Sequence, residues 1–329
     1  MTSSERMLAP DPFDRTDRTD RTDRTDRTDR PFCHRRASLK LELNFTLRVG
    51  LAALLLSGCG TGRSVEPVPF AAAPLEVVVS AYPLAVLVHY VGGKSVKVVD
   101  LAPPGAPPQD LFLSPEQVNM VRSAPLVIDV GDGYQPRVEA VAAGARRHLS
   151  LLPALSSTAQ PYQFWLDPSL MGKAAALVAQ ALGAADAAAK SQFKNGSQDF
   201  QSVVGSIESD LESTFSDCSR QVFVTSDDAF GRFAARYDLN DVAVSAKGVE
   251  KAAALVTENS LPDVFSELGV PAGAVQKVAQ ATGVGVKSLD PMEVAPSIGG
   301  PAPLSYFAVM EEDLTALEVP LACDTSDNY

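Results

Sequence analysis

Hydrophobic residues from position 75 onward form two kinds of segment that alternate along the chain. Short valine-rich runs, such as Leu75-Glu76-Val77-Val78-Val79, have the length and β-branched content of buried strands. Longer segments, such as 82–91 before Gly92-Gly93, have the length and ending of helices. The pattern predicts strands over 75–79, 96–101, 126–130, 221–225, 242–245, 264–266 and 284–289. It predicts helices over 82–91, 134–143, 168–182, 228–237, 249–258, 272–282 and 304–317.

Capping residues indicate where several helices begin. Ser114, Pro115 and Gln117 form the pattern of a capping box with proline in the first turn. Asp167 before Pro168 predicts the N-cap of an Ala- and Leu-rich helix, and Asp228 is expected to cap a later one. The segment 184–215 is expected to hold one or two helices, interrupted near Asn195-Gly196.

The strand–helix alternation occurs twice, on either side of the long helical segment. Strands that are apolar on both faces and alternate with helices predict mainly parallel sheets flanked by helices. The fold class is therefore predicted as α/β, with two lobes. In such folds ligands bind at the carboxyl ends of the strands, so a ligand is expected in the cleft between the lobes.

The first 58 residues have the composition of a segment that is removed from the mature protein. Residues 14–30 repeat Asp-Arg-Thr without an apolar residue and are expected to be disordered, which suggests a start codon assigned too far upstream. Basic residues then precede the apolar run 49–56 and Leu56-Ser57-Gly58-Cys59, which resembles a bacterial lipobox. We predict a disordered leader over 1–34, a lipoprotein signal peptide over 35–58, lipidation of Cys59 and a linker over 59–74.

Two alternatives stay open for this region. The apolar run could instead be a short buried helix that contains a cysteine. Arg35-Arg36-Ala37-Ser38-Leu39-Lys40 is similar to a twin-arginine signal with Ser38 in place of phenylalanine, so both the Sec and the twin-arginine export routes remain.

The charge of the mature part argues against two classes of partner. Residues 59–329 contain 17 basic and 31 acidic residues, so their net charge is −14. Nucleic-acid binding needs a basic surface, and an anionic membrane attracts basic segments. The apolar run before Cys59 is also shorter than the about 20 residues of a membrane-spanning helix. Membrane attachment is therefore expected through the lipid alone.

Two cysteines, Cys218 and Cys323, remain in the mature part beside Cys59. In an oxidising exterior they are expected to form a disulfide, with two separate buried thiols as the alternative.

Five short motifs follow one another between residues 80 and 293. They are Ser80-Ala81-Tyr82-Pro83-Leu84, Pro103-Pro104-Gly105-Ala106-Pro107-Pro108-Gln109-Asp110, Phe164-Trp165-Leu166-Asp167-Pro168, Val224-Thr225-Ser226-Asp227-Asp228-Ala229-Phe230-Gly231 and Leu289-Asp290-Pro291-Met292-Glu293. In this order, behind a lipobox, they resemble the zinc/manganese-type solute-binding lipoproteins of ABC importers, from about residue 75 to Cys323. The resemblance implies an N-terminal lobe over 75–167, a rigid linking helix over 168–183 and a C-terminal lobe over 184–329. A cysteine pair placed like Cys218 and Cys323 is common in that family.

The same resemblance implies a metal site between the lobes, from which this chain departs at each histidine. Gln109 stands at the first histidine position and Gln163 at the second. Asp227 stands where the family has a histidine or glutamate, and Glu267 falls where an acidic residue of the second lobe often completes the site.

The replacements change which cation the site suits. Zinc favours imidazole and thiolate ligands, whereas two amides, an aspartate and a glutamate offer oxygen donors, which suit harder cations such as Ca²⁺, Mg²⁺ or Mn²⁺. The resemblance thus implies zinc or manganese as the cargo, whereas the oxygen donors favour a harder cation. The third alternative is that no cation binds. In the last case Gln109 and Gln163 would hydrogen-bond across the closed lobes. Asp227 is the best candidate for an ion contact, Trp165 is expected in the core, and Glu258 and Glu293 are expected to be solvated.

No enzyme motif is present, so we predict that the protein is not an enzyme. The sequence has no phosphate-binding loop, nucleophile elbow or His-Glu-x-x-His. The histidines His89 and His148 match no ligand position of the family. The leading hypothesis is a monomeric solute-binding lipoprotein on the outer face of the bacterial cell membrane, working with an ABC permease and carrying an altered or degenerate metal site. The alternatives are a non-transporting envelope interaction lipoprotein and a binder of a different small ligand.

Overall fold

The computed structural model describes residues 73–105, 107–109, 111–156, 162–296 and 305–323. The predicted leader, the signal peptide, Cys59 and most of the linker lie outside the described residues. Within the described part, no helix combines the length and the apolar character needed to cross a membrane.

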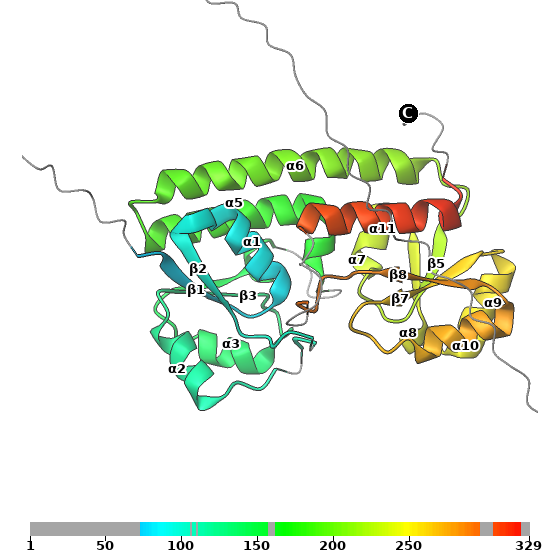
Figure 1. Ribbon diagram of the computed structural model, residues 1–329, viewed down its shortest axis with the longest axis horizontal. Helices are drawn as coiled ribbons and strands as arrows, with labels where there is room; N and C mark the ends of the chain where they lie inside the picture. The colour runs from blue at the N-terminus through cyan, green and yellow to red at the C-terminus, as the bar shows by residue number, and fades with distance from the viewer. Residues whose placement is uncertain (1–72, 106, 110, 157–161, 297–304, 324–329) are drawn as a thin grey trace, which may run out of the picture. The chain divides into compact units, whose positions relative to one another are not determined.

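The first lobe is a four-stranded parallel sheet with the strand order β2-β1-β3-β4. Figure 1 shows α2 and α3 over one face of this sheet, while α1 and the long helix α5 lie over the other. The elements of this lobe are β1 (Leu75–Val79), α1 (Tyr82–Gly92), η1 (Gly93–Ser95), β2 (Val96–Asp100), α2 (Pro115–Ser123), β3 (Leu126–Asp129), α3 (Pro136–Ala142), β4 (His148–Ser150), α4 (Leu151–Ala154) and η2 (Phe164–Leu166).

The second lobe repeats the same topology, with the parallel strand order β6-β5-β7-β8. Its elements are β5 (Val222–Thr225), α7 (Gly231–Arg236), β6 (Asn240–Ala243), α8 (Val244–Lys247), α9 (Val249–Glu258), β7 (Asp263–Glu267), α10 (Gly273–Thr282) and β8 (Gly285–Leu289). The predicted fold class, two α/β lobes with parallel sheets flanked by helices, is confirmed.

Three long helices connect and cover the two lobes. They are α5 (Pro168–Ala185), α6 (Lys190–Ser216) and α11 (Tyr306–Leu321), and Figure 1 shows them on the same side of both sheets. One apolar core lies beneath them and contains residues of both lobes, such as Leu84 and Phe230. Separate, smaller cores lie on the other face of each sheet. The shared core joins the two lobes by burial of apolar surface.

The three predicted caps have different outcomes. Ser114 and Gln117 form the expected capping box at α2, and Asp167 Oδ1 accepts a hydrogen bond of 3.1 Å from the Leu170 N–H at the start of α5. Asp228 is not a cap, because α7 begins later, at Gly231, with Phe230 as its N-cap residue and no side-chain cap. The predicted 228–237 helix therefore began too early.

The predicted interruption near Asn195-Gly196 is wrong, since α6 runs unbroken through both residues. A Cβ atom at Gly196 would lie 2.5 Å from the carbonyl oxygen of Val91 in α1. Gly196 thus permits the close approach of two helices, and tertiary packing offsets its low helix propensity.

The strand β4 was not predicted from the sequence, and the strand predicted at 242–245 lies earlier, as β6. β4 has only three residues, and its polar residues His148 and Ser150 on either side of Leu149 hide the strand pattern.

The cysteines Cys218 and Cys323 are joined by a disulfide. Backbone hydrogen bonds beside it, from Ser219 N–H to Ala322 O (3.1 Å) and from Arg220 N–H to Leu321 O (2.9 Å), hold the end of α11 against the segment that follows α6. The end of the described chain is therefore fixed to the beginning of the second lobe.

Candidate functional site

The carboxyl ends of β5 and β7 bring Asp227 and Glu267 together. β5 and β7 are neighbours on the two sides of the point where strand order changes direction, which is the usual ligand position in parallel sheets. The Asp227 N–H donates to Glu267 Oε2, and the Ser226 hydroxyl donates to the same oxygen over 3.0 Å. The Glu267 N–H in turn donates to Ser226 Oγ over 2.9 Å. Glu267 is therefore held by the backbone and hydroxyl of the β5 loop.

Burial makes Glu267 a weaker acid than an ordinary glutamate. Burial, then the nearby Asp241 carboxylate, raises the pKa of Glu267 to about 8, although the hydrogen bonds from Asp227 N–H and Ser226 lower it. Its Oε1 is buried and has no hydrogen-bond partner among the described residues. At neutral pH the carboxyl is mostly protonated, and a protonated carboxyl is a poor metal ligand.

Gln109 and Gln163 of the first lobe both contact one carboxylate of the second half, that of Glu293. Gln109 Nε2 donates to Glu293 Oε2 over 3.0 Å, and Gln163 Nε2 donates to Glu293 Oε1 over 2.6 Å. A carboxylate only accepts hydrogen bonds, so each amide presents its nitrogen and turns its oxygen away. Glu293 is only 8% exposed, which corrects the expectation that it is solvated. The two amides thus bind a carboxylate of the opposite lobe directly.

The surroundings of Glu293 shift its pKa in opposite directions. Burial raises its pKa, the hydrogen bonds from Gln163 and Gln109 lower it, and the charges of Asp227 and Asp228 raise it again. Burial and the Glu293 charge also raise the pKa of the Tyr134 phenol well above its ordinary value, so this hydroxyl lies close to the same carboxylate. Glu293 is the candidate site residue that sequence reasoning missed, although it ends the last of the five family motifs.

The loop that carries Glu293 is fixed from both lobes. The Trp165 indole N–H donates to the carbonyl oxygen of Pro291 over 2.8 Å, and Asp313 Oδ1 in α11 accepts from the Asp290 N–H over 2.9 Å. Trp165 is fully buried, as expected for a core residue. The contact of Glu293 with the two amides is therefore preorganised.

The loop of Gln109 is held in a similar way. Gln135 Nε2 donates to the carbonyl oxygens of Pro108 and Ser80, both over 2.8 Å. This places Gln109 near the carboxyl end of β1. Gln163 lies immediately before η2 and is 7% exposed.

The four predicted ligand positions fall into two separate groups. Gln109 and Gln163 both donate to Glu293, whereas the Asp227 N–H donates to Glu267. Asp227 Oδ1 accepts a further hydrogen bond of 2.7 Å from Ser245. Among the described residues, no three histidine, cysteine, aspartate or glutamate side chains lie in an arrangement that could hold a metal ion.

The histidines lie away from these groups. His89 is exposed on α1, and His148 pairs through Nε2 with the buried Asp129 carboxylate over 2.7 Å. This hydrogen bond raises the pKa of His148, which burial alone would lower.

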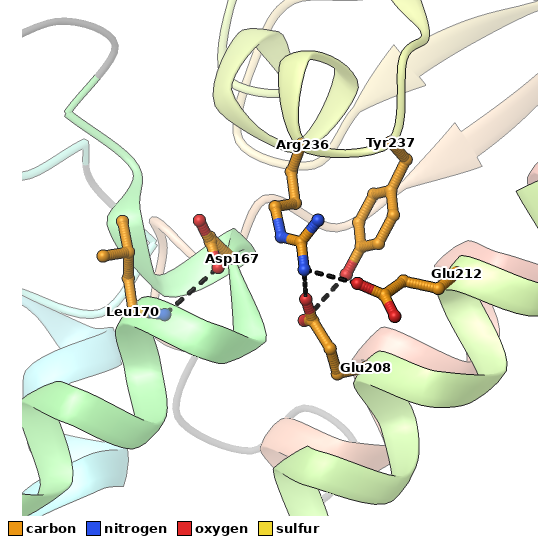
Figure 2. A network of polar contacts seen from close by, with 6 residues as sticks. All are labelled: Asp167, Leu170, Glu208, Glu212, Arg236 and Tyr237. Carbon is orange, nitrogen blue, oxygen red and sulfur yellow. Dashed lines mark hydrogen bonds and ion pairs between the residues drawn. The ribbon is translucent and has the colours of Figure 1, made fainter.

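A polar network links the long helices to the second lobe near the start of α5. In Figure 2, Arg236 at the end of α7 binds Glu208 and Glu212 of α6, and the Tyr237 hydroxyl donates to Glu208 over 3.1 Å. Burial and the Glu208 charge raise the pKa of Tyr237, so the phenol stays protonated as a donor. No pattern in the sequence predicts this network, because its members come from separate elements.

Comparison with known proteins defines the class to which this fold and site belong. The model of a family of solute-binding proteins matches residues 77–319. The chain belongs to this family, which is that of ZnuA, the periplasmic component A of zinc-uptake complexes. Its members are solute-binding proteins of ABC transporters that bind divalent metals, typically zinc, outside the cytoplasm, and they are not enzymes.

Individual relatives are distant in sequence. A protein of Treponema pallidum described as metal-binding is 21% identical over an alignment of 277 residues, which covers 74% of this chain and 86% of the relative. The laminin-binding protein Lmb of Streptococcus agalactiae has a structure that matches with a TM-score of 0.67 at 21% identity, covering 75% of this chain and 99% of Lmb. The zinc-bound ZnuA-like domain of AdcA from Streptococcus pneumoniae matches with a TM-score of 0.67 at 20% identity, with the same coverage. These structures share the fold.

Proposed function

We propose that the protein is an extracytoplasmic solute-binding lipoprotein of a metal-ion ABC importer, with a degenerate zinc site. The observation that supports this most directly is the pair of hydrogen bonds from Gln109 and Gln163 to Glu293. These amides stand at the positions where the family has histidine ligands, and they present N–H donors to a carboxylate.

The chemistry of this contact resembles what a metal would do. A cation between two lobes attracts a carboxylate and holds both sides together. Two amide N–H groups can satisfy the same carboxylate without any cation, since each donates to a different oxygen. Zinc would have to displace both hydrogen bonds and would find amide oxygens in place of imidazole nitrogens. High-affinity zinc binding at these residues is therefore lost.

Once Zn²⁺ is excluded, the oxygen donors still allow a harder cation as the cargo. Asp227 is half-buried, and its charge and that of Asp228 act against the charge of Glu293, which a cation would relieve. The raised pKa of Glu267 works against ligation at neutral pH, because a ligand carboxyl must lose its proton. In this proposal Asp227 is the residue through which any Ca²⁺, Mg²⁺ or Mn²⁺ would act.

The export and membrane parts of the proposal rest on the sequence. Cys59 behind the apolar run would carry the lipid, the linker over 59–74 would lead to the lobes, and the lobes would dock on an ABC permease. Mass spectrometry of the purified protein tests this part: a lipid mass on Cys59, absent from Cys59→Ala, supports it, and an unmodified Cys59 in the membrane fraction contradicts it.

The test of the cargo is a thermal-melt series on protein stripped of metal, with Zn²⁺, Mn²⁺, Ca²⁺ and Mg²⁺ added separately. A cation that binds only the folded protein must raise the melting temperature. The proposal expects no shift with micromolar Zn²⁺. A shift with a harder cation that disappears in Asp227→Ala identifies a rewired site, and a Zn²⁺ shift that disappears in Gln163→Ala overturns the proposal.

A second candidate is a non-transporting interaction lipoprotein on the same scaffold. It is favoured by the direct contact between the lobes, which needs no cargo to form. The related Lmb is described as both an adhesin and a metal transporter, so this fold serves both roles in one protein. Crosslinking in membranes separates the candidates: attachment to a permease supports transport, and attachment to another envelope protein without a permease supports the alternative.

A further inference from the structure

A groove separate from the candidate metal site lies between α1, β2 and the beginning of α11. Its volume is about 390 Å³, within the range of small-molecule sites. The lining is mainly apolar and aromatic, and it includes Tyr82, Val86, Tyr90, Asp100, Tyr306 and Phe307. α1 and β2 belong to the first lobe and α11 follows the second, so a molecule in the groove would touch both.

The aromatic side chains give the groove defined walls. Tyr90 and Phe307 meet edge to face with ring centroids 5.3 Å apart, and Tyr306 and Phe307 meet at 5.7 Å. Tyr90 remains 39% exposed, so this wall is open to solvent on one side. Aromatic faces of this kind attract cations through the ring quadrupole.

One end of the groove carries unbalanced negative charge. Asp100, at the carboxyl end of β2, uses Oδ1 to accept the Ala102 N–H over 3.0 Å, while its Oδ2 is buried without a hydrogen-bond partner in the described part of the chain. The charges of Asp290 and Asp100 both act on the Tyr82 phenol, so these three groups lie near one another. Among the described residues no basic side chain forms an ion pair with Asp100 or Asp290.

Asp100 lines the groove and has no basic partner among the described residues, which indicates what kind of ligand head would fit there. A half-buried carboxylate without a counter-charge is costly, and an ammonium group would supply both charge and hydrogen bonds. Burial raises the pKa of Asp100 to about 6, which agrees with a carboxylate that lacks a cation.

We propose that this groove binds a small organic ammonium ion whose apolar body lies along α1, with Asp100 as the partner of the ammonium group. From Tyr82 to His89, the length of α1 that lines the groove is about 10 Å, which suits a body of one ring and a short alkyl chain. The aromatic side chains cover the body, and the negative charge of Asp100 disfavours anionic ligands.

The test compares three probes of nearly equal size in the presence of a chelator: 4-phenylbutylamine, 4-phenylbutanol and 4-phenylbutanoate. Binding to the full chain is measured by calorimetry at pH 7.5. The amine is expected to bind about tenfold more tightly than the alcohol, which is the effect of one favourable charged contact, and the carboxylate more weakly than both.

Variants assign the binding to the groove. Asp100→Asn should bring the amine to the affinity of the alcohol, while Asp132→Asn, an exposed aspartate outside the lining, should bind like the unchanged protein. Ala85→Trp should block all probes by filling the groove. The ratio of amine to alcohol affinity within one variant does not depend on the fraction folded. An unchanged ratio in Asp100→Asn, absence of amine binding, or binding that persists in Ala85→Trp would overturn the proposal.

Discussion

Gln163 donates its amide N–H to Glu293 over 2.6 Å, and both side chains are more than nine-tenths buried. A neutral donor from one lobe and a carboxylate from the other thus meet, and we propose that Gln163 occupies a ligand position of the family. In that proposal the contact keeps the lobes together without zinc.

Removal of the shared acceptor should destabilise the protein strongly. Glu293→Ala leaves the buried amide of Gln163 and the half-buried amide of Gln109 without their partner, and an unpaired buried polar group costs about 1–3 kcal/mol. We expect the free energy of unfolding in urea to fall by about 2–4 kcal/mol. Glu258→Ala, at an exposed position of α9, is the matched control and should change it by less than about 0.5 kcal/mol. Equal effects of the two substitutions would refute this role of Glu293.

The stability of the second lobe should decrease as pH rises from about 4 to about 8. Glu267 and Asp241 have folded pKa values raised to about 8 and about 7, above their ordinary values of 4.5 and 3.8. A raised carboxyl pKa means that the folded state binds the proton more tightly. Its stabilisation is complete below the unfolded pKa and is lost as pH rises through the folded pKa.

Glu267→Gln tests this pH dependence. The amide cannot titrate, so the melting temperature of this variant should vary less between pH 5 and pH 8.5 than that of the unchanged protein. Glu258→Gln keeps both buried carboxyls and should follow the unchanged profile. Parallel profiles for all three proteins would show that Glu267 does not titrate as described.

Gly196 and Gly205 should respond in opposite ways to substitution by alanine. Both lie in α6, but a Cβ at Gly196 would meet the Val91 carbonyl oxygen at 2.5 Å, whereas nothing lies within 4 Å of a Cβ at Gly205. Gly196→Ala should destabilise by about 1–3 kcal/mol, and Gly205→Ala should stabilise by about 0.5–1 kcal/mol. Denaturant unfolding of the two variants measures both values, and stabilisation by Gly196→Ala would contradict the packing of α1 on α6.

The disulfide should be needed for full stability. Cys218 and Cys323 are 105 residues apart in sequence, and loss of such a bridge typically costs about 2–5 kcal/mol. Dithiothreitol should lower the melting temperature of the unchanged protein to that of the Cys218→Ala/Cys323→Ala variant. The variant itself should not respond to the reductant, and a response there would point to another cause.

The sequence predicts the fold well because the fold depends on local patterns. Valine-rich strands other than the one predicted at 242–245, the Ser114–Gln117 capping box and the Asp167 cap are confirmed where expected. The interruption at Gly196 was wrong because the reason for this glycine lies in another helix, at Val91.

The candidate site was less predictable, since hydrogen-bond partners come from distant segments. The motif order placed Gln109 and Gln163 correctly in one region, but Glu293 is 130 residues from Gln163 in sequence. Only the folded chain shows that this glutamate is buried and lies between two amides. From sequence alone, an acidic residue in a loop is expected to be solvated, because the groups that donate hydrogen bonds to it are not known.

The equilibrium binding of Zn²⁺ to metal-stripped protein tests the central claim most directly, when the unchanged chain is compared with the Gln109→His/Gln163→His variant. The variant would place two imidazoles beside Glu293, a His₂Glu donor set that zinc accepts. We predict no micromolar binding to the unchanged chain and a gain of binding in the variant. Micromolar binding to the unchanged chain, abolished by Gln163→Ala, would contradict the conclusion that the two amides replace the metal.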